Sequence, residues 1–398
     1  MYKYIHPQEY NIQSKTDGIN YYLLNQFFTV RYNKSMNEHN IRKNGFLLLS
    51  KYRTAIMGFA ALWILFFHVW QPLIPVSSNR FLIFFVLFEH FSTNFGYSGV
   101  DIFFLLSGAG LTYAIKKESI PVFYARRLLK VLPPFLLLAV LRSVFQNWTI
   151  LDFVCNVSGY SFYAVHIFTF LWFVTAIITL YFFFPLYYRI FSKAKNKLIF
   201  TCCVILVWML ITFLVRNIMR SDLFAFTNRI PIFVVGIYVG YVSQNYKEIV
   251  FKKWVYLLLL IVLSLGLYLA YLYNYTSFHI FVTQGNTFLP PFLIAISLPF
   301  LLAKLLDILE NRISTLGKII NVTLSFFGAM SLELYCFQDW LDMYTPYLQY
   351  YGVPKTVINF SLILISIAAA WASAKLIKLF SQEIPDRIKN KKMKEKAT

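Results

Sequence analysis

Long apolar runs recur between residues 54 and 377, and they constrain the fold of this chain more than any other feature. A helix needs about 20 apolar residues to cross the roughly 30 Å hydrocarbon core of a bilayer. Only helices and closed barrels can span lipid, because the backbone must satisfy its own hydrogen bonds there. The runs are continuous rather than alternating, which predicts an all-α integral membrane protein. About ten spans are expected, near residues 54–71, 97–115, 131–146, 166–188, 198–215, 229–243, 254–273, 288–303, 324–341 and 356–377.

The composition agrees with a membrane protein. Of the 398 residues, 59% are hydrophobic and only 14% are charged, against about 25% in soluble domains. A net charge of +20 would indicate nucleic acid in a soluble protein. Here most of the 37 Lys and Arg residues lie in the two terminal segments and in alternate loops. This distribution follows the positive-inside rule, so it predicts that both termini are cytoplasmic and that the chain contacts membrane lipid but no nucleic acid.

The charge distribution also divides the chain into three parts. These are an N-terminal cytoplasmic segment at 1–52, a membrane domain at 53–378 and a basic cytoplasmic tail at 379–398. Within the first part, residues 21–30 are expected to form an interfacial helix or to be disordered. The apolar run 81–91 is too short to span a bilayer and is expected as an interfacial or re-entrant helix. The four cysteines lack metal-ligand spacing, so no metal site is expected.

The first apolar run carries two polar residues, Arg53 and His68. On a helix they lie about 22 Å apart along the axis and about 60° apart around it, so they share a broad face. A histidine well inside a span is costly and is by default a candidate functional residue. The alternative is a structural histidine that hydrogen-bonds a carbonyl of a neighbouring helix.

Two further polar motifs follow along the chain. Asp101 lies in GYSGVDIFFLLSG at 96–108, where a carboxylate needs a partner or a water-filled cavity. Arg126 and Arg127 lie in FYARRLLKVLPP at 123–134, before two prolines that predict a broken helix. Two guanidinium groups at such a place suit a phosphorylated ligand from the cytoplasm. Alternatively, they are only a positive-inside stop signal.

Six segments follow one another along the chain. They are LFFH at 65–68, the two motifs at 96–108 and 123–134, LWF at 171–173 with Tyr181 and Pro185, RIPIF at 229–233 with Gly236 and Gly240, and GAMSLELY at 328–335. In this order they resemble the membrane-bound acyltransferases of family 3, multi-pass enzymes that O-acylate cell-envelope glycans. The resemblance covers about residues 52–377. Two positions depart from the family pattern: Met57 stands where the family often has an arginine, and Gln338 where it has a late histidine.

The resemblance implies an acyl-CoA, most often acetyl-CoA, as co-substrate, with no bound cofactor. It implies a hydroxyl of an envelope polysaccharide or lipid-linked glycan as acceptor, and a bacterial plasma (inner) membrane as location. An alcohol is a poor nucleophile until a base takes its proton. His68 is the candidate base, because an unperturbed imidazole titrates near pH ~6.5. Direct transfer and a covalent acyl intermediate on His68 both stay open.

The other catalytic and donor-binding candidates are four residues. Asp101 is expected to orient His68 or to pair with an arginine. Arg126 and Arg127 are expected to hold the phosphates of the donor. Arg53 is expected to do the same or to neutralise the donor inside the cavity.

Candidates for the acceptor site are Arg229, Glu333 and Trp172. For Arg229 the alternative is an interfacial anchor, for Glu333 a structural hydrogen bond, and for Trp172 simple packing. Two other functions stay open for the whole chain. One is a glycan or lipid transporter without chemistry, and the other is an inactive member of the family, in view of Met57 and Gln338.

Overall fold

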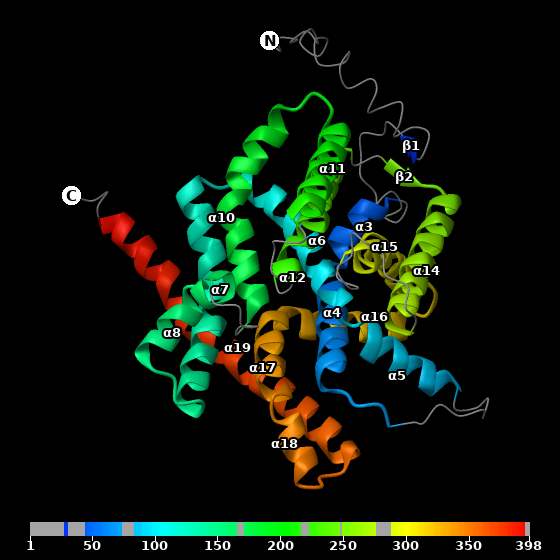
Figure 1. Cartoon of the computed structure of the whole chain (residues 1–398). Helices are drawn as coiled ribbons and strands as arrows, with labels where there is room; N and C mark the ends of the chain where they lie inside the picture. Colours follow the sequence, from blue (N-terminus) through cyan, green and yellow to red (C-terminus); the bar gives the residue numbers. More distant parts are fainter. Residues whose placement is uncertain are drawn as a thin grey trace.

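The chain folds almost entirely into α-helices (Figure 1). The structure is a computed structural model that describes residues 28–30, 44–73, 83–164, 171–215, 223–246, 249–275 and 288–394. Among these residues, eight helices are long and apolar enough to cross a membrane, and the number is ten if each of two bent helix pairs counts as one span. The prediction of an all-α, multi-pass membrane protein is therefore confirmed.

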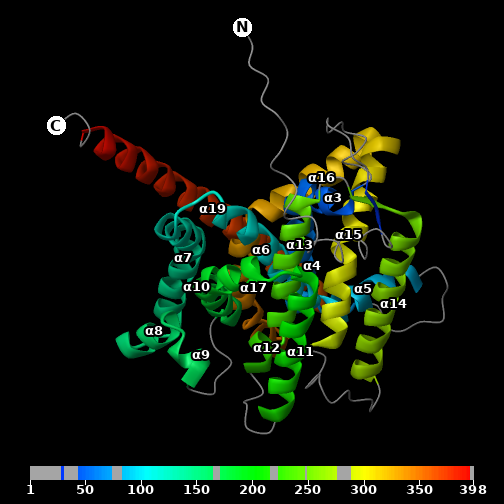
Figure 2. The same ribbon diagram turned by 90° about the horizontal axis from the view of Figure 1, so that it is seen from above.

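The described residues contain eight helices that are each long and apolar enough to form a single span, and two bent helix pairs. The eight single spans are α6 (Ser98–Ile115), α7 (Ile120–Phe145), α10 (Trp172–Lys193), α11 (Lys197–Val215), α13 (Ile230–Asn245, preceded by α12, Phe224–Thr227), α14 (Lys253–Tyr275), α15 (Leu289–Arg312) and α19 (Lys355–Lys394). The bent pairs are α3 (Gly45–Lys51) with α4 (Arg53–Val69), at 70°, and α16 (Ser314–Ala329) with α17 (Ser331–Asp342), at 68°. α19 projects from the bundle toward the C-terminus, and α14 lies at the periphery (Figure 2).

Short elements cap the two ends of the bundle. They are α5 (Ile83–Phe95), α8 (Ile150–Val157), α9 (Tyr160–Ala164) and α18 (Thr345–Tyr350), with the antiparallel strands β1 (Phe28–Val30) and β2 (Ile249–Phe251). The expected helix or disorder at 21–30 is wrong for residues 28–30, because their backbone pairs with β2. The rest of 21–30 lies outside the described residues. The run 81–91 contributes to α5, which is too short to span, as expected.

The predicted break at the two prolines of α7 is wrong. Pro133 and Pro134 lie inside one continuous helix of 26 residues. Prolines are tolerated in membrane helices where neighbouring groups and local adjustments satisfy the freed carbonyls. As a consequence, the span begins at Ile120 rather than near residue 131. Arg126 and Arg127 therefore project from the same rigid helix as the apolar residues that follow.

The expected span at 324–341 is not one straight helix, because it is part of a bent helix pair. The helix breaks at Met330, whose backbone is non-helical (φ −116°, ψ 26°), and α17 continues in another direction. Glu333 lies in the first turn after this break. The bend places α17 against α4, α7 and α19 instead of continuing the line of α16.

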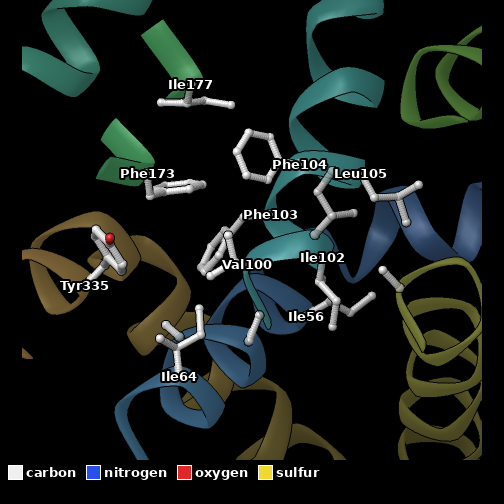
Figure 3. Packing of buried hydrophobic residues seen from close by; sticks show 14 of the residues in the cluster. Ile56, Ile64, Val100, Ile102, Phe103, Phe104, Leu105, Phe173, Ile177 and Tyr335 are labelled. Carbon is white, nitrogen blue, oxygen red and sulfur yellow. The ribbon is translucent and has the colours of Figure 1, made fainter. Parts of the chain in front are cut away.

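Glycines bring the central helices into backbone contact. A Cβ atom on Gly108 of α6 would overlap the carbonyl oxygen of Phe233 in α13, and Gly236 and Gly240 of α13 meet α6 in the same way. Small residues are the usual means of close helix approach in membranes, where lipid supplies no hydrophobic driving force between helices. Large rings of α6 face α10: Figure 3 shows Phe103 and Phe104 pointing toward Phe173, and their ring centres lie 6.0 and 5.2 Å from that of Phe173.

Candidate active site

Two adjoining cavities lie between the central helices. The larger one, of about 460 Å³, lies between α3, α4, α6, the start of α7 and α13. The smaller one, of about 80 Å³, lies between α4, α6, α7, α10 and α17. Arg53, Gly110 and Arg127 line both of them. We call them the large cavity and the small cavity; the shared residues make them parts of one site.

Four basic side chains line this site, together with the acidic Glu118 in the large cavity. Lys117 lines the large cavity, Lys130 the small one, and Arg53 and Arg127 both. Arg53 donates from Nη2 to the carbonyl oxygen of Leu106 (3.3 Å). The Nε atoms of Arg53 and Arg127 are buried without a hydrogen-bond partner among the described residues. Their donor capacity is thus available to an anionic ligand, which guanidinium groups bind through charge-assisted hydrogen bonds.

The two adjacent arginines of α7 have different environments. Arg126 is 65% exposed and pairs with Glu118 (Nη1–Oε1, 2.6 Å), and it lines neither cavity. Arg127 points inward, and its guanidinium lies 5.7 Å from the ring centre of Phe123. Consecutive residues on a helix lie about 100° apart around the axis, so only one of them can face the site. Lys130, one turn beyond Arg127, shares its face, although we did not single it out from the sequence.

The inner end of the small cavity is apolar. It is lined by Met57, Phe103, Phe173 and Tyr335. Phe173 packs edge-on against Tyr335 with ring centres 5.1 Å apart, and Figure 3 shows Tyr335 beyond Phe173 as seen from α6. The small cavity therefore has charge at one end and aromatic rings at the other.

His68 lies in the last turn of α4 with its side chain 31% exposed. Its Nδ1 is 3.8 Å from Oδ2 of Asp342, at the end of α17. Asp339, one turn earlier in α17, also interacts electrostatically with His68 and lies 3.3 Å from Nη1 of Arg142. We did not single out Asp339, Asp342 or Arg142 from the sequence. The sequence does mark two of them, because Arg142 and Asp339 are charged residues inside expected spans and such residues are candidate functional residues.

Neither cavity reaches His68. Among the described residues, the lining of the small cavity ends at Met57 on α4 and at Tyr335 on α17. His68 lies eleven residues after Met57, which is about 16 Å further along α4 and about 20° around it. On α17, Asp339 and Asp342 follow Tyr335 along one helix face. Between the small cavity and His68, α4 and α17 pack against each other.

Asp101 pairs with an arginine and not with His68. Its Oδ2 lies 3.5 Å from Nε of Arg229, and both side chains are at most 4% exposed. The guanidinium of Arg229 also lies 5.4 Å from the ring centre of Trp172. Of the two roles expected for Asp101, the structure shows the pairing with an arginine. Arg229 and Trp172, expected near an acceptor, belong to this buried cluster, so the structure does not show Arg229 as an exposed contact.

Glu333, the third acceptor candidate, lies close to the donor side of the site. It is half-buried and interacts electrostatically with Lys130 of α7. Glu333 is therefore a counter-charge for the basic residues of the site. It lies more than two turns along α17 from Asp342, the residue beside His68.

These features define a membrane protein with two internal cavities that share basic residues, and with a histidine beside two carboxylates near the opposite end of the bundle. The model of the acyltransferase domain family matches residues 55–375, so the chain belongs to this family and is a membrane acyltransferase. No curated protein and no solved structure matches the chain in our comparisons. The family match agrees with the resemblance seen in the sequence.

Proposed function

We propose that this membrane acyltransferase moves an acyl group, most simply acetyl, from cytoplasmic acyl-CoA to a hydroxyl of an envelope polysaccharide or lipid-linked glycan. The observation that carries the proposal is the pair of joined cavities. Arg53, Arg127, Lys117 and Lys130 line them. An acyl-CoA has phosphates at one end and a thioester at the other, which matches a basic cavity that narrows toward an apolar end.

The sizes of the cavities favour a short acyl group. The nucleotide part would occupy the large cavity, of about 460 Å³. The acyl end would point into the small cavity, of about 80 Å³, where Phe103, Phe173 and Tyr335 close the space. Overfilling such a packed site is costly, so acetyl is a better candidate than a long chain.

The acceptor would approach from the other end of the bundle. His68 and Asp342 are about one-third exposed there, whereas the Lys and Arg distribution predicts a cytoplasmic α6–α7 connection. Donor and acceptor would then enter from opposite faces of a bacterial plasma membrane. His68 would act as the base. Because about 16 Å of α4 separates it from Met57 of the small cavity, the proposal requires the contact between α4 and α17 to open when the substrates bind.

The adjacent arginines of α7 supply the test. Purified protein in lipid nanodiscs is given radiolabelled acetyl-CoA and an envelope glycan extract, and both thiol release and labelled glycan are measured. Arg127→Ala removes charged hydrogen bonds worth about 1.5–3 kcal/mol, so the KM for acetyl-CoA should rise at least about tenfold. Arg126→Ala is the matched control and should change KM less than about threefold, because Arg126 faces away from both cavities.

Three outcomes would contradict the proposal. Equal effects of the two substitutions would contradict the donor site. Acetyl-CoA binding without thioester cleavage would indicate an inactive family member. Movement of glycan or lipid across the membrane without label transfer would favour the transporter alternative.

A further inference from the structure

We propose that Asp342 is a positioning residue for His68. Its carboxylate would hold the Nδ1 side of the imidazole, so that Nε2 faces the acceptor hydroxyl. The inference rests on the proposed function, because it concerns the base of the same transfer reaction. Asp101 cannot supply this contact in the structure, since its carboxylate is committed to Arg229 (3.5 Å).

The geometry carries the first step. The Nδ1 atom of His68 and Oδ2 of Asp342 are 3.8 Å apart, with side chains 31% and 38% exposed. This separation exceeds a hydrogen bond, but catalytic hydrogen bonds are often long in unliganded enzymes and shorten when substrate binds. Since Nδ1 faces Asp342, the other ring nitrogen is left for the acceptor. A carboxylate on Nδ1–H fixes the tautomer in which Nε2 can take a proton.

The surrounding charges explain why Asp342, and not Asp339, is left for His68. Arg142 lies 3.3 Å from Asp339 and also donates from Nε to Oε1 of Gln146 (3.0 Å). Asp339 therefore has an ion pair of its own with Arg142, in addition to its electrostatic interaction with His68. Asp342, three residues later, has no basic partner other than His68 among the described residues.

The other carboxylate near this end of α4 is already engaged. Glu89 of α5 accepts hydrogen bonds from Nε1 of Trp70 and from the backbone N–H of Leu73, each at 3.0 Å. It thereby fixes the chain that leaves α4. Asp342 is therefore the carboxylate that the geometry assigns to the imidazole.

A second set of contacts fixes the distance between His68 and Asp342. Asn359 of α19 exchanges two hydrogen bonds with the backbone of Gln71: its Oδ1 accepts from the N–H (2.9 Å) and its Nδ2 donates to the carbonyl oxygen (2.8 Å). Gln349 of α18 donates to the side-chain oxygen of Gln71 (2.6 Å). These hydrogen bonds join Gln71, three residues after His68, to α18 and α19, which follow Asp342 in the chain.

The reaction step balances without any further reactant. Nε2 of His68 takes the proton of the acceptor hydroxyl while its oxygen attacks the thioester carbonyl carbon. The new C–O bond forms, the C–S bond breaks and its electron pair goes to sulfur. The proton then passes from His68 to the thiolate, which leaves an ester, free CoA thiol and neutral His68. The carboxylate of Asp342 stabilises the transient imidazolium and is unchanged at the end.

The experiment compares four variants in the acetyl-transfer assay described above. His68→Ala should lower kcat at least about 100-fold, the lower range for general base catalysis. Asp342→Asn should lower kcat about tenfold or more with the KM for acetyl-CoA unchanged. The loss should stay below the ~10⁴-fold of a buried triad carboxylate, because Asp342 is 38% exposed. Asp342→Glu, which keeps the charge, should restore part of kcat.

Asp152→Asn is the matched control, because this exposed carboxylate only caps α8; it should leave kcat and KM unchanged. Thermal unfolding and size-exclusion profiles of all variants separate folding from catalysis. Wild-type kcat in folded Asp342→Asn, with His68→Ala inactive, would overturn the role of Asp342 and leave the proposed function intact. Full activity of His68→Ala, or no thiol release by the wild type, would overturn the proposed mechanism together with the inference.

Discussion

At the scale of single residues, the site shows how neighbours in sequence acquire different roles. Arg126 and Arg127 are equivalent as a sequence motif, yet Arg126 is exposed and pairs with Glu118 at the edge of the large cavity, whereas Arg127 lines both cavities. The sequence showed two adjacent cationic residues. It could not show which of them faces the protein interior, because a helix broken at Pro133 would not fix how residues 126 and 127 are oriented around the axis. The continuous helix α7 fixes that orientation.

Asp101 illustrates the second limit at this scale. A carboxylate inside a span needs a partner or a water-filled cavity, and the sequence predicted this for Asp101. The identity of the partner depends on which helix packs against α6, and that helix is α13, which presents Arg229 from a position 128 residues later in the chain. Nothing in the local sequence encodes this pairing.

We predict that Asp101→Asn destabilises the protein. The substitution leaves Arg229 buried without its counter-charge, which costs about 3–5 kcal/mol, so the thermal unfolding temperature in detergent should fall. Adding Arg229→Gln removes the uncompensated charge. The double variant should therefore be more stable than the sum of the two single effects. Additive losses would mean that the 3.5 Å pair contributes no coupling energy.

At the scale of elements, α6 serves two functions on two faces. Gly108 allows backbone contact with α13, whereas Gly110 lines both cavities and leaves room for the guanidinium of Arg53. The sequence suggests close helix approach from its small residues. It does not reveal which glycine allows helix packing and which one lines the cavities, because Gly108 and Gly110 lie only two residues apart in the same apolar run.

The two glycines should respond differently to the same substitution. Gly108→Ala places a Cβ against the backbone of α13, which cannot move away easily, so stability should fall by about 1–3 kcal/mol. Gly110→Ala places a Cβ 2.9 Å from Nη2 of Arg53, a side chain that can shift. Its unfolding temperature should change little, while the KM for acetyl-CoA should rise several-fold. Thermal unfolding and the transfer assay, run on both variants, check this; a reversed pattern would contradict the division of roles.

The break at Met330 is the other element that decides the site. α16 packs against α4, and after the 68° bend α17 packs against α4, α7 and α19. Glu333 and Gln338 signalled an irregular span in the sequence, but the site depends on the angle, which only packing against α4, α7 and α19 determines.

At the scale of the whole molecule, the donor and acceptor ends of the proposed reaction lie at opposite ends of the bundle. This arrangement requires the α6–α7 connection on one side of the membrane and α18 on the other. The positive-inside distribution predicts that the first side is cytoplasmic and that both termini lie there.

Cysteine labelling in intact cells checks this topology. In a background in which Cys155, Cys202, Cys203 and Cys336 are replaced by alanine, Lys117→Cys should react with a membrane-impermeant maleimide only after the cells are opened. Tyr350→Cys, at an exposed position of α18, should react in intact cells. Labelling of both residues from the same side would contradict opposite entry of donor and acceptor.

The sequence by itself determined that the chain is a helical, multi-pass membrane protein, which family it belongs to, and that Arg53, His68, Asp101 and the arginine pair are its unusual polar residues. These conclusions follow from the cost of polar groups in lipid, which is a local property of each apolar run. The tertiary structure alone decided that Arg127 and Lys130 line the cavities, that Asp101 pairs with Arg229, and that Asp342 lies beside His68. Those pairings arise from helix contacts between distant segments, and no local pattern specifies which buried charge meets which partner.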